Sequence, residues 1–212
     1  MSKKTPPKPR VLSARSLREA ARHLSRSDQI MARLVAEHGP FPLADREASP
    51  FQTLTSSIIR QLLSRKAADV IEGRVLALAP SFSPSGFLEV PAQALRQAGL
   101  SWAKAKSLLE LAARVDDGRL DFEALPRRSD DEVIAALTEL PGVGRWTAEM
   151  FLIFGLKRPD VLSLGDAGLR RSARLLYGDE TGLEEIGQAW RPYRSVASWY
   201  LWRHLAPAKP AA

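Results

Sequence analysis

The sequence contains no cysteine among its 212 residues. This absence excludes disulfides, iron–sulfur clusters, thiolate-bound zinc and cysteine nucleophiles. Only three histidines are present, and the wide separation of His23, His38 and His204 argues against a histidine-built metal site. No apolar run approaches the roughly 18 residues of a membrane-spanning helix, and no apolar segment near the amino terminus suits a secretory signal. We therefore expect no membrane contact and a cytoplasmic location, associated with the nucleoid if the source is prokaryotic.

Basic residues outnumber acidic ones, with 31 Lys and Arg against 24 Asp and Glu and a net charge of +7. This excess of positive charge favours a polyanion as the partner class. Residues 1–10 contain four basic side chains, several prolines and no acid. Such a composition predicts a disordered basic arm, which would serve either as a solubilising tail or as a weak contact to the polyanion.

Apolar residues recur at helical spacing along nearly the whole chain, whereas the alternation typical of strands is absent. The sequence therefore predicts an all-α protein. One predicted helix face is formed by Phe51, Leu54, Ile58 and Leu62. Further helices are expected over residues 12–24, 28–38, 66–78, 91–98, 102–116 and 121–125, with a loop over 80–86.

The segment 129–155 has the local pattern of two helices joined by a tight turn. Ser129 and Glu132 form a capping-box pair at the start of the first helix. This helix ends at Pro141-Gly142-Val143-Gly144, and the second helix is expected from about 145 to 154. A turn this short requires the two helices to pack as a tight pair. The apolar face of the first helix is formed by Val133, Leu137 and Leu140.

The Pro-Gly-Val-Gly turn presents unpaired backbone N–H groups at the start of the second helix. Because Gly142 and Gly144 have no side chains, a phosphate group can approach these donors closely. Such backbone contacts hold nucleic acid without reading its sequence. The alternative is an ordinary helical hairpin whose glycines serve only the backbone geometry, and the turn alone does not separate the two.

Asp166 precedes the helical segment AGLRRSARLLYG and is predicted to be its N-cap. That structural role would by itself explain the residue. A carboxylate at a helix start that faces a cleft can also stabilise the positive charge that develops on a sugar during N-glycosidic cleavage, and can orient the attacking water. Both roles remain open at the level of the residue alone.

The string LPGVGRWTAEMFLIFG, followed by a loop and by LGDAGLRR, resembles the helix-hairpin-helix DNA glycosylases. The resemblance extends over most of residues 51–205. It implies two helical lobes that flank a cleft, a hairpin that grips the DNA backbone, and Asp166 as the catalytic aspartate. We expect a central lobe over 50–156 and a second lobe that combines 11–49 with 157–212, without an N-terminal β domain.

Two features of the sequence favour the alkylation-repair branch of this superfamily, 3-methyladenine DNA glycosylase II. Bifunctional members use a lysine just after the hairpin turn as an amine nucleophile, and this sequence has Trp146 there. Iron–sulfur members need cysteines. The resemblance thus implies a monofunctional glycosylase without lyase activity, which flips alkylated bases of the 3-methyladenine and 7-methylguanine type out of DNA and hydrolyses their N-glycosidic bonds in base excision repair. The alternatives are an oxidised-purine or mismatch glycosylase on the same fold, or a non-catalytic hairpin protein that binds DNA.

The base pocket of this branch uses aromatic faces to hold cationic purines. The resemblance implies this role for Trp146 and Trp202, and it places Met150 at the position of a pocket tyrosine. The remaining tryptophans are expected in the core: Trp102, Trp190 and Trp199.

A wedge residue in this superfamily follows a glutamine and fills the gap that the extruded base leaves. The resemblance implies that Gln61 and Leu62 form this wedge. Leu62 could instead extend the apolar face of Phe51 and Ile58 into the core, and the sequence leaves both interpretations open.

The resemblance also implies contacts to the DNA backbone from Gly142, Val143, Gly144, Arg145 and Thr147. A monovalent cation, Na⁺ or K⁺, is expected at the hairpin on the backbone carbonyls of Thr138, Leu140 and Val143. No cofactor is expected for catalysis. The expected partner is double-stranded DNA, bound by a monomer without sequence preference.

Overall fold

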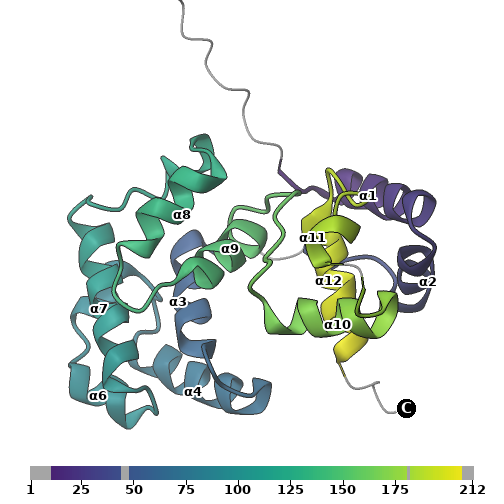
Figure 1. Cartoon of the computed structure of the whole chain (residues 1–212). Helices are drawn as coiled ribbons and strands as arrows, with labels where there is room; N and C mark the ends of the chain where they lie inside the picture. Colours follow the sequence, from purple (N-terminus) through teal and green to yellow (C-terminus); the bar gives the residue numbers. More distant parts are fainter. Residues whose placement is uncertain (1–10, 44–47, 181, 207–212) are drawn as a thin grey trace, which may run out of the picture. The chain divides into compact units, whose positions relative to one another are not determined.

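The structure is a computed structural model that describes residues 11–43, 48–180 and 182–206. Within these ranges the chain is helical and contains no strand (Figure 1), which confirms the predicted all-α fold class. The chain divides into two compact units. The central unit is Ala48–Leu156, and the terminal unit combines the described residues before Ala48 with those after Leu156. The predicted basic arm, 1–10, lies outside the described residues.

The central unit is built around α3, which packs against α7 and α9. The apolar side of α3 buries Phe51, Leu54 and Ile58, as the helical spacing predicts. Phe51 also contacts Phe82 and Phe87 edge-on, with ring centroids 6.4 and 5.6 Å away. The helices of this unit are α3 (Pro50–Arg60), α4 (Arg65–Leu78), α5 (Pro84–Leu88), α6 (Ala92–Gln97), α7 (Trp102–Asp116), the 3₁₀ helix η1 (Leu125–Arg127), α8 (Asp130–Thr138) and α9 (Arg145–Phe154).

Two local predictions in the central unit are wrong. The predicted loop over 80–86 contains the start of α5, because the Ser83 hydroxyl accepts the N–H of Gly86 (3.1 Å) as an N-cap and Pro84 occupies the first helical position. No α-helix forms over 121–125. There the Asp121 carboxylate accepts the N–H groups of the residues two and three positions later, and this turn replaces the helical pattern.

The terminal unit brings together segments from both ends of the sequence, drawn purple and yellow in Figure 1. Helix α12 packs against α1, α2 and α10. The helices of this unit are α1 (Ala14–Ser27), α2 (Gln29–His38), α10 (Ala167–Tyr177), α11 (Leu183–Ile186) and α12 (Arg194–Leu205). Among the described residues, no helix is both long and apolar enough to cross a membrane.

Asp28 organises the core of the terminal unit from the corner between α1 and α2. Its carboxylate caps α2 and also accepts the Tyr177 hydroxyl (2.6 Å) and the Trp190 indole N–H (2.9 Å). Burial, together with this hydrogen bond to Asp28, raises the pKa of Tyr177. A single half-buried carboxylate thus ties the corner to α10 and to the segment before α12.

The three tryptophans expected in the core differ in burial. Trp190 is fully buried, as predicted. Trp199 is half-buried and stacks on Phe41 with ring centroids 4.9 Å apart. Trp102 is 56% exposed, so its core assignment is wrong. It is the first residue of α7, and the buried positions of that helix begin only at Ala105.

Candidate DNA-binding and catalytic site

The hairpin of α8 and α9 forms as the local sequence predicts. The Ser129 hydroxyl accepts the N–H of Glu132, while the N–H of Ser129 donates to the Glu132 carboxylate (2.7 Å). The Ser129 hydroxyl also donates to this carboxylate (2.8 Å), and the two hydrogen bonds that the carboxylate accepts from Ser129 lower the pKa of Glu132. The predicted apolar face is buried at Val133, Leu137 and Leu140. The hairpin is therefore anchored at its start and along its core-facing side.

The turn between α8 and α9 requires glycine at position 142 for two reasons. The φ angle of Gly142 is 78°, and a Cβ there would lie 2.5 Å from the Ser107 hydroxyl of α7. The N–H of Val143 donates to the carbonyl of Leu140 (3.1 Å) and thereby closes the turn. This hydrogen bond engages the Val143 donor inside the hairpin.

Helix α9 begins at Arg145, and its N-cap, Gly144, provides no side-chain cap to the first turn. The first N–H groups of a helix have no intrahelical acceptor and attract anions. Arg145 adds an exposed guanidinium (69% exposed) that pairs with Glu149 at 2.9 Å. Thr147 is buried, and its hydroxyl accepts a hydrogen bond from Gln61. Its side chain thus serves the protein interior, and only its backbone remains a candidate for phosphate contact.

The wedge loop, residues 61–64, joins α3 to α4. Helix α3 ends at Arg60, and Leu62 adopts a φ of 55° with its side chain fully exposed (105%). The core interpretation of Leu62 is therefore wrong, and the exposure agrees with the wedge interpretation. Gln61 is directed inward: its amide donates to the Gly142 carbonyl (3.0 Å) and to the Thr147 hydroxyl (2.9 Å). Gln61 is thus a link between the wedge loop and the hairpin.

Asp166 is the N-cap of α10, as predicted. Its Oδ1 accepts the N–H of Leu169 at 2.7 Å and also the indole N–H of Trp202 at 3.0 Å. The residue is 7% exposed. Two donors on one oxygen fix the orientation of the carboxylate, so the structure joins two site residues that lie 36 positions apart.

Gly168 is a residue of this cluster that the sequence analysis did not single out. A Cβ at Gly168 would lie 3.1 Å from Oδ1 of Asp166 and 3.4 Å from Cδ1 of Trp202. The first separation is tighter than most Cβ contacts, and the second is an ordinary van der Waals contact. Gly168 thus leaves room for the contact between Asp166 and Trp202. The only local signal for it is its position two residues after the aspartate.

Trp146 and Met150 lie one turn apart on α9, and residues at this spacing share a helix face. Trp146 is 40% exposed, whereas Met150 is buried. The exposed indole offers an apolar surface for a ring, and the flexible thioether of Met150 lies one turn further along the helix, in the interior. Trp202, the other predicted pocket residue, is half-buried in the terminal unit.

The predicted cation site consists of the carbonyl groups of Thr138, Leu140 and Val143. Oxygen donors of this kind suit a hard cation. The Leu140 carbonyl already accepts the N–H of Val143, which leaves it one lone pair for a ligand. The site remains a prediction. Among the described residues, no group of three or more His, Asp or Glu side chains could hold a metal ion.

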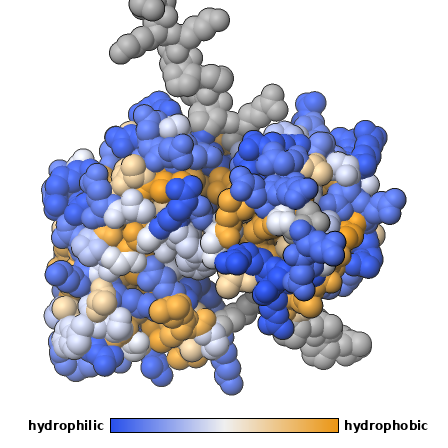
Figure 2. Space-filling view, viewed as in Figure 1, coloured by the Kyte–Doolittle hydropathy of each residue, from blue (hydrophilic) through white to orange (hydrophobic). Residues whose placement is uncertain are grey.

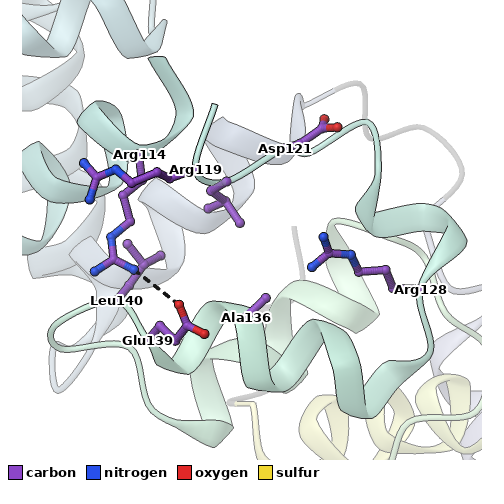
Figure 3. A pocket seen from close by; sticks show the side chains of 8 residues that line it. Arg114, Arg119, Asp121, Arg128, Ala136, Glu139 and Leu140 are labelled. Carbon is purple, nitrogen blue, oxygen red and sulfur yellow. Dashed lines mark ion pairs between the residues drawn. The ribbon is translucent and has the colours of Figure 1, made fainter. Parts of the chain in front are cut away.

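A pocket of about 150 Å³ lies between the end of α7, the loop after it and α8 (Figure 3). Two of its three arginines are engaged by neighbouring acids. Arg114 pairs with Glu110 at 2.7 Å and with Glu139 at 3.8 Å, and Arg119 pairs with Asp117 at 2.7 Å. Among the predicted site residues it contains only Leu140. We therefore assign it no part in the candidate site.

The central unit has, on the face seen in Figure 2, hydrophobic patches among hydrophilic side chains. Its large exposed apolar side chains are Leu62, Val70, Leu76, Leu78, Leu88, Trp102 and Trp146. Two of these, Leu62 and Trp146, are predicted to contact DNA.

Comparison with known proteins places these features in a family, although no family model matches the chain. DNA-3-methyladenine glycosylase 1 of Schizosaccharomyces pombe is 32% identical over 199 residues, which cover 89% of this chain and 87% of the relative. The chain belongs to the DNA-3-methyladenine glycosylase family. This membership confirms the predicted superfamily and its alkylation-repair branch.

Solved structures of DNA-3-methyladenine glycosylases agree with this membership. The glycosidase of Bacillus halodurans is 40% identical, with a TM-score of 0.74 and coverage of 92% of this chain and 91% of its own. The S. pombe enzyme in complex with abasic DNA is 30% identical, with a TM-score of 0.79 and coverage of 90% and 98%. The DNA-3-methyladenine glycosylase fold is thus shared over nearly the whole length of each protein.

Proposed function

We propose that this chain is a monofunctional DNA glycosylase that removes alkylated bases of the 3-methyladenine and 7-methylguanine type in base excision repair. The observation that carries the proposal is the Asp166 carboxylate, held by the Leu169 N–H and the Trp202 indole in a member of this family. A fixed carboxylate stabilises developing positive charge without reorganising during the reaction.

Asp166 acts on the sugar of the extruded nucleotide. As the N-glycosidic bond lengthens, positive charge grows on the sugar ring, and the carboxylate stabilises it and orients the attacking water. Alkylated purines such as 3-methyladenine are cationic, and aromatic faces attract cations. We retain Trp146, Met150 and Trp202 as the residues that contact the base.

Double-stranded DNA is the proposed partner, bound by a monomer without sequence preference. The start of α9 supplies backbone donors for phosphate, and Arg145 adds charge. The DNA-bound S. pombe relative supports a DNA partner. Leu62, exposed and apolar, is the proposed wedge that fills the gap after base flipping. A cytoplasmic location remains part of this proposal.

A panel of duplexes tests the substrate class. The purified chain is incubated with duplexes that contain 7-methylguanine, 3-methyladenine, 8-oxoguanine or a mismatch, and released bases are separated by chromatography. The proposal expects release of the methylated purines alone. Preferential release of 8-oxoguanine or of a mismatched base would favour the rival glycosylase classes, and release of no base would favour a DNA-binding protein without catalysis.

A further inference from the structure

A lysine of α7 contacts the backbone on both sides of the point where α3 ends. The Nζ of Lys104 donates to the carbonyl of Ile59 (2.7 Å) and to the carbonyl of Gln61 (2.6 Å). The last carbonyls of a helix have no intrahelical donor, and the helix dipole makes this end attractive to a cation. Burial lowers the pKa of Lys104, as expected for an ammonium drawn out of solvent. Lys104 thus closes the end of α3 with two charge-assisted hydrogen bonds.

Gln61 is held a second time through its side chain. Its amide donates to the Gly142 carbonyl and to the Thr147 hydroxyl of the hairpin. Helix α7 also contacts the hairpin directly, since Ser107 lies where a Cβ of Gly142 would be. These groups all belong to the central unit. The wedge loop, α7 and the hairpin turn are therefore held together by direct hydrogen bonds and contacts.

Leu62 follows this doubly held glutamine and has two unfavourable properties. Its backbone is in the left-handed region (φ 55°), which is unfavourable for a residue with a Cβ. Its fully exposed side chain gains nothing from burial. Such a conformation persists only where several contacts of the surrounding structure hold it in place. The hydrogen bonds that hold Gln61 provide that constraint directly next to Leu62.

We propose that Lys104 is a positioning residue that holds the wedge loop in its DNA-inserting conformation before DNA binds. The inference rests on the proposed function, because it assigns a purpose to an exposed Leu62. Lys104 acts through the carbonyls of Ile59 and Gln61 and does not contact the base. A loop that is ordered before DNA binds loses little conformational entropy when the complex forms, and binding is stronger for that reason.

Lys104→Met removes both donors and retains the apolar stem. Lys106→Met is the matched control, because Lys106 lies exposed on the same helix and its loss changes the net charge equally. Lys104→Arg retains charge and donors and should restore part of the function. Affinity is measured on duplex DNA with an abasic site, and base release on methylated duplex and single-stranded DNA, each for the wild type and for Leu62→Ala.

Lys104→Met is expected to weaken affinity for abasic duplex and to slow duplex excision roughly tenfold relative to Lys106→Met. The defect should shrink on single strands, where no gap needs to be filled. In the Leu62→Ala background the same substitution should have little further effect, because the residue through which it acts is absent. If Lys104 only stabilised the fold, Lys104→Met would slow excision equally on duplex and single strands, and equally in the wild type and in Leu62→Ala.

The inference would be overturned if Lys104→Met and Lys106→Met had equal affinity for abasic duplex and equal rates of base release. It would also be overturned if Lys104→Met lowered the affinity as strongly in Leu62→Ala as in the wild type. If Lys104→Met does not fold, Lys104→Gln replaces it, since that side chain is one atom shorter, uncharged and unable to reach both carbonyls. A wild type that excises no base would overturn the proposed function alone. The affinities of the wild type, Lys104→Met, Leu62→Ala and the double variant for abasic duplex would still decide the role of Lys104.

Discussion

The indole nitrogen of Trp202 donates a 3.0 Å hydrogen bond to the same carboxylate oxygen of Asp166 that caps α10. Trp202 lies on α12, so the orientation of the carboxylate depends on how α12 packs against α10. The N-cap and catalytic interpretations of Asp166 are therefore compatible. The Leu169 N–H and the Trp202 indole both donate to Oδ1 of this carboxylate.

Trp202→Phe tests this relationship, because it removes the donor and retains an aromatic ring. A hydrogen bond to a charged group contributes about 1.5–3 kcal/mol, so we expect single-turnover base release to fall about tenfold or more. The melting temperature should also fall, by about 2–4 °C for each kcal/mol of folding free energy lost, so base release is measured at a temperature at which both proteins are folded. Unchanged base release in Trp202→Phe would show that the indole does not orient the carboxylate.

Leu62→Ala tests the wedge. Because Leu62 is fully exposed, the substitution should leave the free energy of unfolding nearly unchanged, in contrast to the roughly 2–5 kcal/mol lost at a core leucine. It should weaken binding to abasic duplex and slow excision from duplex more than from single strands. Equal defects on both substrates would redirect the search for the wedge to Leu63, because the Gln61 amide is engaged by the hairpin.

The reaction type is testable from the product. With Trp146 at the position of the lyase lysine, the enzyme should leave an intact abasic site, and strand breaks should appear only after alkali treatment. Gel electrophoresis with and without alkali measures this. Efficient borohydride trapping of a covalent enzyme–DNA adduct would contradict the monofunctional assignment.

Binding to undamaged duplex should weaken steeply with salt and vary little with sequence. The exposed side chains to test are Lys66, Arg145, Arg170 and Arg171. Where one of these side chains contacts a phosphate, its substitution with alanine should reduce the slope of log K against log salt concentration by about one. Arg15→Ala, which removes an exposed charge paired with Glu19, is the control. Affinity that does not change between low and physiological salt would refute the electrostatic account.

Local signals were enough to predict the hairpin and the N-cap. Ser129 with Glu132, the glycines of the turn and the aspartate before α10 each act within a few residues, so the sequence carries their signals directly. The start of α5 lies in the predicted loop over 80–86, because Pro84 and Gly86 are typical of loops, although the first turn of a helix accepts proline.

Contacts between distant residues could not be predicted from these patterns. The apolar spacing of α3 continues to Leu62, but the helix stops at Arg60, where Lys104 binds the terminal carbonyls and the hairpin binds Gln61. The sequence around α3 cannot predict these two contacts, because Lys104 and the hairpin lie far along the chain. The contact between Asp166 and Trp202, across 36 positions, likewise depends on the packing of α10 against α12.

Base release by Asp166→Asn tests the central claim most directly. Wild type and variant are incubated with N-methylated duplex DNA, and the released bases are quantified by chromatography. Asparagine is a good N-cap, so the variant should fold and bind abasic DNA like the wild type. We predict that it releases methylated purines on the order of 10²- to 10⁴-fold more slowly. Release close to the wild-type rate would contradict the assignment of Asp166 as the catalytic carboxylate.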